Sequence, residues 1–386
     1  MPECDESKNA ASLDINDLGD KNDIQGLISI VKYGSPGKKK TAIRWLGQLS
    51  GKEAVKCLLE TALNKQGGIA VIRNAILALG YAGDHSVVEP LIYLMGAYQY
   101  PDVKRAAAVA LGELKDEKAI GALALLMNDE EQDIFTRGGA AEALCKIGTE
   151  GAFANVVSAL EDNRLGNKVA NALMGAGEKA VQPLISNLDV QRKSKVVEIL
   201  GKIGSKQAAK PLLKLLGNEI SLGFGNTYDH GNSNLEAVVR ALVAVGDTEI
   251  TKQAVEKLLG AMRLNPLPGD VDYPLQNMLL FALGESQDEQ AIEPLVKQLL
   301  ASHEQRIKWT AAHALAILGV KINDSEIIHQ LAEVLNNEQK HRQYIDLSGW
   351  RNCIAWALVN AGKDQGWTAV VVNQRNGTLF KPNTFR

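Results

Sequence analysis

The nine residues ILALGYAGD, at positions 76–84, decide the fold because the chain repeats their pattern ten times. The pattern consists of small apolar positions, a leucine, often a glycine, and then a turn. Residues 108–116, for example, read AVALGELKD. The anchoring leucines are separated by 27 to 43 residues, with a mean of about 35. They are Leu46, Leu79, Leu111, Leu144, Leu173, Leu200, Leu242, Leu283, Leu315 and Leu358.

Most anchors are followed by a turn and a second apolar run, such as VVEPLIYLM at residues 87–95. Each repeat is therefore predicted to be a helical hairpin whose apolar faces need neighbours on both sides. Residues 25–362 resemble HEAT repeats, which implies an all-α fold, a right-handed α-solenoid superhelix of about ten hairpins. Prolines stand in the first turn of four second runs, where a missing N–H costs least: Pro90, Pro183, Pro211 and Pro294.

Composition supports helices and argues against several classes of function. Hydrophobic residues make up 46% of the 386 residues but aromatics only 5%, which suits closely packed helices better than a β-sandwich. The formal net charge is -3, whereas a dedicated nucleic-acid binder is usually strongly basic. The sequence has no apolar run long enough for a membrane span.

The ends of the chain differ from the repeats. Residues 1–24 contain seven acids and two lysines and are predicted to be a poorly ordered leader, and residues 363–386 a C-terminal tail. The leader lacks the basic start and apolar stretch of a secretory signal. The four cysteines show no CxxC pair, so we expect a cytoplasmic protein.

Three long gaps between anchors predict insertions near residues 217–233, 262–274 and 336–349. Insertions in a solenoid map to loops on one face, often the binding face. All three lie in the C-terminal half, where we therefore expect the functional centre.

A stripe of exposed side chains is predicted at the positions six and two residues before each anchor, which lie four apart on one helix. The stripe begins basic, becomes mixed in the middle, and ends with aromatic residues and a histidine. In order, the pairs are Lys40/Arg44, Arg73/Leu77, Arg105/Val109, Gly138/Glu142, Asn167/Asn171, Ser194/Glu198, Glu236/Arg240, Asn277/Phe281, Trp309/His313 and Asn352/Trp356. In HEAT repeats this helix lines the concave surface, so the resemblance places the stripe facing a ligand.

Structural roles are the alternative for these residues. An aromatic side chain on a solenoid helix can pack under a loop, and a basic one can pair with a turn aspartate of the next repeat. The turn aspartates are Asp84, Asp116, Asp247 and Asp288.

Few motifs of known chemistry are present. There is no P-loop, no GxSxG, no dinucleotide fingerprint and no set of His-Glu pairs for a metal centre, so we expect no metal and no cofactor. Tyr228, Asp229 and His230 form a cluster in the first insertion that is suited to proton transfer. An Asx-type turn with a surface histidine is the alternative there. Cys353 is a candidate reactive thiol or, alternatively, a buried small hydrophobe.

Two stretches extend the resemblance beyond HEAT repeats. TAIRWLGQLSGKEAV at residues 41–55 and GGIAVIRNAILALGYAGD at residues 67–84 resemble the opening repeats of the E/F-type phycobilin lyases. Those proteins carry Ala-x-Trp-Leu-Gly, then Gly-Gly leading into Arg-Asn-Ala-x-x-Ala-Leu-Gly. The matching residues here are Ala42, Trp45, Leu46, Gly47, Gly67, Gly68, Arg73, Asn74, Ala75, Ala78, Leu79 and Gly80. The length resembles the single-chain members, which include lyases and lyase-isomerases of phycoerythrin.

The resemblance implies that the protein binds a linear tetrapyrrole (bilin), such as phycoerythrobilin, as its substrate. It would attach the bilin through a thioether to a cysteine of a phycobiliprotein subunit, with double-bond isomerisation as a further option. Implied bilin-binding residues are Phe281, Trp309, Trp356 and Arg240, the last one for a propionate. Implied catalytic residues are Asp229 for the pyrrole N–H groups and Tyr228, His230 or His313 for proton transfer. Cys353, the candidate reactive thiol, is a further predicted catalytic residue. Implied acceptor-binding residues are Lys40, Arg44, Arg73 and Arg105.

Two other classes remain open. A HEAT-repeat scaffold or adaptor that binds phycobiliproteins or other proteins without chemistry is the main alternative. A HEAT-like DNA glycosylase is the weaker one, because Glu142, Glu198 and Glu236 in the middle of the stripe would repel phosphates.

Overall fold

The computed structural model describes residues 14–188, 193–225, 235–264, 273–302, 305–319 and 324–331, together with residues 354 and 357. In these residues the regular structure is entirely helical. The chain divides into two compact units, Met1–Asn187 and Leu188–Arg386, which we call unit 1 and unit 2. The predicted all-α solenoid fold is confirmed. The division follows α13 (Val181–Ser186), a helix of only six residues.

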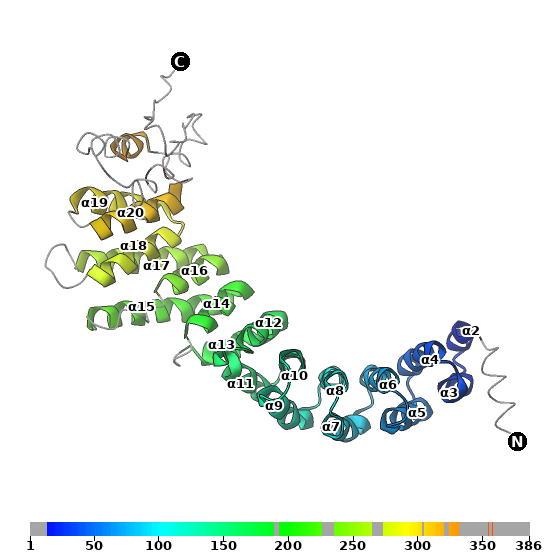
Figure 1. The fold of residues 1–386 in the computed structure, drawn as a ribbon. Helices are drawn as coiled ribbons and strands as arrows, with labels where there is room; N and C mark the ends of the chain where they lie inside the picture. The colour runs from blue at the N-terminus through cyan, green and yellow to red at the C-terminus, as the bar shows by residue number, and fades with distance from the viewer. Residues whose placement is uncertain are drawn as a thin grey trace, which may run out of the picture. The chain divides into compact units, whose positions relative to one another are not determined.

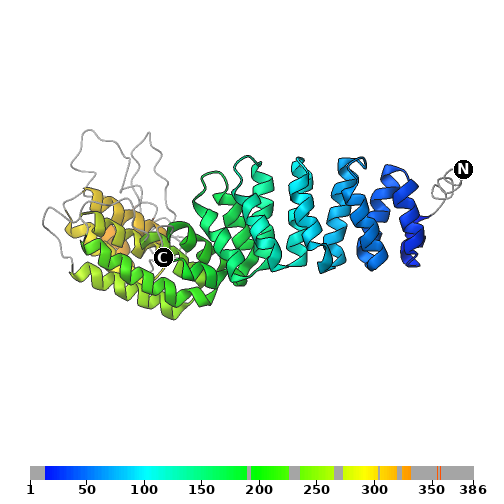
Figure 2. The same ribbon diagram turned by 90° about the horizontal axis from the view of Figure 1, so that it is seen from below.

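Within unit 1, consecutive helices alternate between two rows, as the hairpin pattern predicts (Figure 1). The second helices of the hairpins are α4 (Pro36–Leu49), α6 (Ile69–Ala82), α8 (Pro101–Leu114), α10 (Ile134–Ile147) and α12 (Gly166–Ala176). The first helices are α3 (Ile24–Tyr33), α5 (Lys52–Leu63), α7 (Val88–Ala97), α9 (Ile120–Asn128) and α11 (Glu150–Ser158). A short helix, α2 (Ile15–Asp20), precedes them. Figure 2 shows the hairpins of unit 1 side by side.

Unit 2 continues the alternation. Its helices are α14 (Lys193–Ile203), α15 (Ala209–Gly225), α16 (Leu235–Val245), α17 (Thr248–Leu264), α18 (Tyr273–Glu285), α19 (Ile292–Ala301) and α20 (Gln305–Leu318). None of the helices in the described residues combines the length and apolar character needed to cross a membrane.

The repeated Leu-Gly pair has two separate roles in packing. The nine anchoring leucines from Leu46 to Leu315 are all buried, with at most 1% of their surface exposed. Where a glycine follows the anchor, it lies against the alanine that precedes the next anchor. A methyl group added at Gly47 would lie 2.9 Å from Cβ of Ala78, and one at Gly80 only 2.6 Å from Cα of Ala110. The glycines therefore let neighbouring second helices approach until their backbones touch.

The turns after the anchors use aspartate as a helix cap. Asp84, Asp116 and Asp288 each accept a hydrogen bond from the backbone N–H two residues later, at the start of a short 3-10 helix. Asp247 accepts from the N–H of Ile250. The turn aspartates therefore act as helix caps. Pairing with a lysine or arginine of the stripe was the alternative structural role. The four prolines each stand third in an α-helix, as expected.

Three predicted boundaries differ from the structure. The leader predicted for residues 1–24 is shorter, because α2 buries Leu18 and the Asp14 and Asp23 side chains cap α2 and α3. The insertion predicted at residues 217–233 is helical as far as Gly225 in α15, and the one at residues 262–274 is helical at both ends. Residues 1–13, the rest of these insertions, and the whole of 336–349 and 363–386 lie outside the described residues.

Candidate functional site

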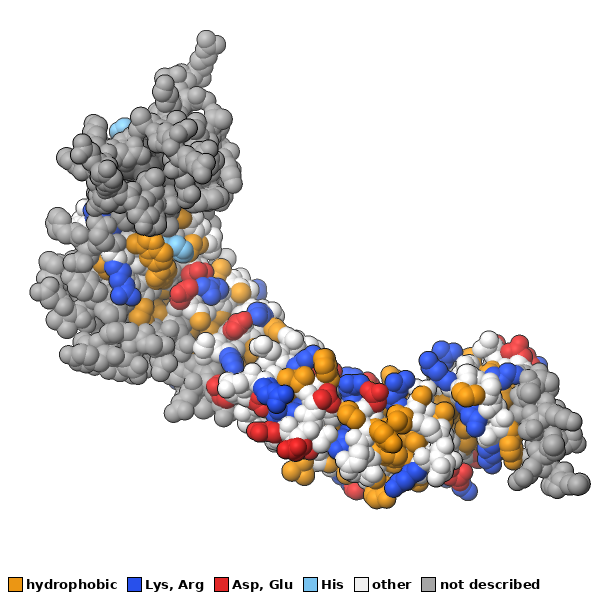
Figure 3. All heavy atoms as spheres, viewed as in Figure 1, with side chains coloured by type: hydrophobic (Ala, Val, Ile, Leu, Met, Phe, Trp, Pro, Cys, Tyr) orange, Lys and Arg blue, Asp and Glu red, His pale blue; other side chains and the backbone are white. Residues whose placement is uncertain are grey.

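Three ring side chains form a cluster on α18 and α20 in unit 2, at the aromatic end of the predicted stripe. Trp309 and His313 are one turn apart on α20 and stack, with ring centroids 5.2 Å apart and planes 28° apart. Phe281 of α18 meets both edge-on, at 5.7 Å from Trp309 and 5.5 Å from His313. Trp309 is 38% exposed. Figure 3, viewed as in Figure 1, shows hydrophobic side chains beside a histidine in the region of α18 and α20, with charged side chains nearby.

His313 is packed on one side of its ring. Its Nδ1 atom is buried and has no hydrogen-bond partner among the described residues. The ring as a whole is only half-buried. Any proton that His313 exchanges with a ligand must therefore pass through Nε2.

The cluster stands on a buried polar contact between the same two helices. The Thr310 hydroxyl donates to the side-chain carbonyl of Asn277 at 2.6 Å. Asn277 is only 5% exposed, so this stripe position is buried where we predicted exposure. The physical reason is that an amide buried between helices needs a polar partner, and the hydroxyl of Thr310 supplies one. This contact fixes α18 against α20 and thereby positions Phe281 and Trp309.

Arg240 on α16, the predicted propionate ligand, already has two carboxylate partners. Its Nε and Nη2 atoms donate to the two oxygens of Glu285 on α18, each at 3.1 Å, and Nη2 also pairs with Glu236. The hydrogen bond with Glu285 raises the pKa of Arg240. The side chain of Arg240 remains 58% exposed. A ligand carboxylate that binds Arg240 must therefore compete with Glu285.

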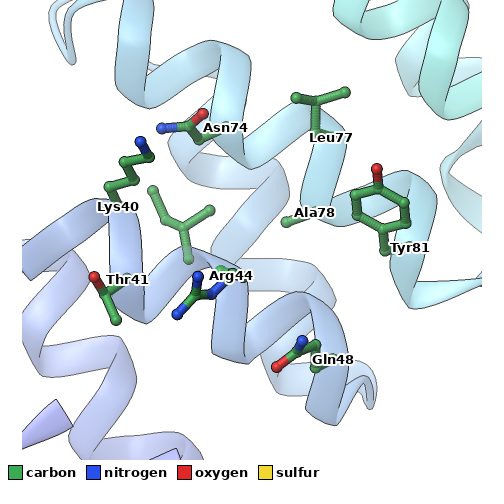
Figure 4. Close-up of a pocket in the computed structure, with 9 residues that line it drawn as sticks. Lys40, Thr41, Arg44, Gln48, Asn74, Leu77, Ala78 and Tyr81 are labelled. Atoms are coloured by element: carbon green, nitrogen blue, oxygen red, sulfur yellow. The ribbon is translucent and has the colours of Figure 1, made fainter. Parts of the chain in front are cut away.

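A pocket of about 630 Å³ lies between α4 and α6 in unit 1, where Lys40 and Arg44 were predicted to bind the acceptor. Figure 4 shows Lys40 and Arg44 on α4, and Asn74 and Tyr81 on α6, around this pocket. The complete lining is Lys40, Thr41, Ile43, Arg44, Gln48, Asn74, Leu77, Ala78 and Tyr81.

The other two predicted acceptor-binding residues lie outside this pocket. Arg73 is half-buried on α6. Arg105 on α8 is paired with Asp102 at 2.5 Å. We predicted exposed basic residues but not a pocket; the signal we overlooked is that neither α4 nor α6 contains an acid.

Five predicted site residues lie outside the described residues: Tyr228, Asp229, His230, Cys353 and Trp356. Two other cysteines are described, Cys57 and Cys145, and both are buried thiols. Burial raises the pKa of Cys145 to about 12, which keeps this thiol protonated and unreactive. No cluster of three His, Cys, Asp or Glu side chains in the described part of the chain is arranged to hold a metal ion.

Comparisons with known proteins agree with the repeat architecture. The family model of HEAT repeats matches residues 62–137. Phycocyanobilin lyase subunit alpha of Picosynechococcus sp. is 34% identical over 110 residues, which are 27% of this chain and 41% of that protein. The chain thus matches less than half the length of this relative.

Two solved structures are among those similar to this chain. In the CpcE–CpcF complex of phycocyanin lyase from Nostoc sp. PCC7120, the matched chain is 21% identical, with 66% of this chain and 93% of that one covered and a TM-score of 0.35. The karyopherin Kap121p bound to Ste12p is 14% identical, with 89% and 41% covered and a TM-score of 0.53, a likeness of fold alone. The chain is an all-α solenoid of HEAT-like repeats, and its partial match to a lyase subunit confirms the predicted resemblance to the E/F-type phycobilin lyases.

Proposed function

We propose that this protein binds a linear tetrapyrrole and attaches it through a thioether to a cysteine of a phycobiliprotein subunit. The observation that carries the proposal is the ring cluster of Trp309, Phe281 and His313, with Trp309 exposed and the other two half-buried, which suits a flat conjugated ligand. The partial identity to a phycocyanobilin lyase subunit gives independent support.

The attachment is a thiol addition. The S–H bond of the acceptor cysteine breaks, a C–S bond forms at the ethylidene group of ring A, and the proton is taken up by the tetrapyrrole. The step needs no oxidant or reductant, so the protein has to hold the bilin, present the thiol and assist proton transfer. Nε2 of His313 is the described candidate for proton transfer, and Asp229, Tyr228 and His230 are proposed for the same task in the first insertion.

Two finer assignments belong to the same proposal. Isomerisation of a double bond, as in the lyase-isomerases of phycoerythrin, would remove a proton at one carbon and return one at another, which again requires a base beside the stacked ligand. The acceptor subunit is proposed to bind the basic stripe residues of unit 1, which are Lys40, Arg44, Arg73 and Arg105.

Bilin binding is tested by titrating the purified protein with phycocyanobilin and with phycoerythrobilin while recording absorbance and fluorescence. We expect a sharpened, red-shifted band for one of them, and a Kd about 3- to 10-fold weaker in Trp309→Ala from the lost stacking. Tyr93→Ala is the matched control, because Tyr93 is an aromatic residue 62% exposed on the first helix α7. The absence of a spectral change with both pigments would contradict the proposal.

Transfer is tested by adding an acceptor phycobiliprotein subunit and separating the products under denaturing conditions. Pigment that stays on the acceptor, and is absent from its Cys→Ser variant, supports lyase chemistry. Binding of the acceptor without any bilin binding or transfer would instead favour a scaffold or adaptor.

A further inference from the structure

The pocket between α4 and α6 carries positive charge that none of its lining residues neutralises. Lys40 and Arg44 line one wall, and the lining contains no carboxylate. The two helices together contain five basic residues and no Asp or Glu; the basic residues are Lys38, Lys39, Lys40, Arg44 and Arg73. On α8 and α10, by contrast, three basic side chains have acidic partners: Arg105 pairs with Asp102, Arg137 with Asp162 and Lys146 with Glu113.

This arrangement is unfavourable for the isolated chain. Three consecutive lysines, at positions 38 to 40, stand in the first two turns of α4, where the helix dipole favours negative charge. Lys40 and Arg44 are like charges four residues apart on one helix face, which destabilises a helix further. Proteins violate such local rules mainly at functional sites. A bound anion would relieve the repulsion between Lys40 and Arg44, the two cations that line the pocket.

The rest of the pocket is suited to an apolar molecule. Ile43, Leu77 and Ala78 supply aliphatic surface, and Tyr81 adds a ring that is 65% exposed. The amides of Gln48 and Asn74 add hydrogen-bonding groups from the two opposite helices (Figure 4). A volume of about 630 Å³ lies in the range of small-molecule sites. Cations beside apolar walls in a pocket of this size match an amphipathic organic anion.

We infer that the pocket between α4 and α6 binds a small amphipathic carboxylate, with its apolar body on Leu77 and Tyr81 and its charge on Lys40 and Arg44. This site lies in unit 1 and is distinct from the ring cluster of unit 2, so the inference goes beyond the proposed function. A bilin with its two propionates belongs to this ligand class, and it would then have a second site on the protein.

The test uses the full chain and two probes, phycocyanobilin and the fluorescent amphipathic anion 8-anilinonaphthalene-1-sulfonate. The double variant Lys40→Gln/Arg44→Gln removes both cations. Its matched control is Lys52→Gln/Lys56→Gln, which removes two exposed cations with the same spacing from α5. We expect the first variant to weaken binding at one class of site about 10- to 100-fold, and the control to match the wild type. The dimethyl ester of the bilin, which lacks the charges, should bind both variants equally.

The outcomes separate this inference from the proposed function. Equal binding of both probes by the two double variants and the wild type would overturn the inference, even with bilin bound at Trp309. Binding of neither probe by the wild type would overturn it as well. If the sulfonate probe requires Lys40 and Arg44 while bilin does not bind at all, the pocket is supported and the proposed function fails.

Discussion

Arg44 on α4 and Arg240 on α16 occupy the same position of their repeats, two residues before the anchoring leucine, yet their surroundings differ. Arg240 is held by two glutamates, one on its own helix and one on α18. Arg44 faces a pocket without a single carboxylate in its lining. The repeat therefore determines where on the helix each of these two arginines lies, while the neighbouring helix determines what it can bind. The charge of Arg240 is neutralised within the protein, whereas the charges of Lys40 and Arg44 in the pocket between α4 and α6 remain available to a ligand.

The largest effect is expected from a third arginine, which separates structural pairing from ligand binding. Arg137 on α10 is 5% exposed, donates to the backbone carbonyl of Met127 at 2.8 Å, and pairs with Asp162 at 2.5 Å. Asp162→Asn keeps the shape but leaves a buried charge uncompensated, and we expect a loss of about 2–3 kcal/mol of stability. Glu285→Gln beside the exposed Arg240 should cost less than about 1 kcal/mol. Urea unfolding of both variants checks this order, and similar losses would contradict it.

The next prediction tests whether the helices beside Arg44 and those beside Arg240 are packed through the same glycine–alanine contact. A methyl group at Gly47 or Gly201 would lie 2.9 to 3.0 Å from atoms of Ala78 or Ala241 on the neighbouring helix. Gly47→Ala and Gly201→Ala should each destabilise the protein by about 1–2 kcal/mol, because the helices must move apart. Gly260→Ala is the control, since Gly260 stands in α17 with open space around it. This control should be neutral or slightly stabilising in thermal unfolding. A small loss of stability in Gly47→Ala together with a large one in Gly201→Ala would show that the helix packing beside Arg44 and beside Arg240 differs.

A third prediction adds a carboxylate beside Lys40 and Arg44 and removes the carboxylates beside Arg240. Asn74→Glu places a carboxylate in the pocket between α4 and α6, and should weaken binding of an amphipathic anion about 10-fold. Asn171→Glu is the matched control, because Asn171 is an exposed asparagine on α12, another second helix of unit 1. Conversely, Glu236→Gln/Glu285→Gln frees Arg240 and should create anion binding in unit 2. Both changes are measured with the fluorescent sulfonate. If neither Asn74→Glu nor Glu236→Gln/Glu285→Gln changed binding of the sulfonate, charge pairing would not be what distinguishes the surroundings of Arg44 from those of Arg240.

The smallest effect is expected from pH, acting on two aspartates of unit 1, Asp116 and Asp162. The hydrogen bond from His85 lowers the pKa of Asp116, and the backbone N–H of Leu165, together with Arg137, lowers that of Asp162. A lowered pKa contributes stability above the ordinary Asp value of about 3.9 and loses it as pH falls through the folded-state value. The contribution of these two aspartates to stability should therefore be constant from neutral pH to about 5 and decline below about 4. Asp116→Asn should reduce the slope of that decline, and an unchanged slope would exclude Asp116 as a contributor.

The sequence predicted the parts of the fold that depend on periodicity. Burial of a leucine such as Leu79 and the start of α7 two residues before Pro90 follow from one repeat considered alone. Leu18 was missed because its burial in α2 lies outside the repeated pattern. The acidic composition of the first 24 residues concealed it.

The candidate site was predicted less completely, because its chemistry depends on contacts between repeats. Trp309 and His313 were placed together correctly, since they lie four residues apart on one helix. The Arg240–Glu285 pair joins residues 45 positions apart, and the Asn277–Thr310 bond joins residues 33 apart. No spacing rule within a repeat predicts such partners. The pocket between α4 and α6 was missed for the same reason.

The glycine–alanine contact between successive second helices also bears on how such a chain can grow. Gly47, Gly80 and Gly112 each meet an alanine of the next repeat in the same way, so these junctions are interchangeable parts. A repeat copied or deleted at such a junction would meet a surface it already fits. Where Cys145 or Met174 follows the anchor instead, the junction lacks the common glycine–alanine contact and fits only the two repeats that form it. Recombination should therefore be tolerated within the first three junctions and fail at the next two, which makes unit 1 partly modular and partly fixed in order.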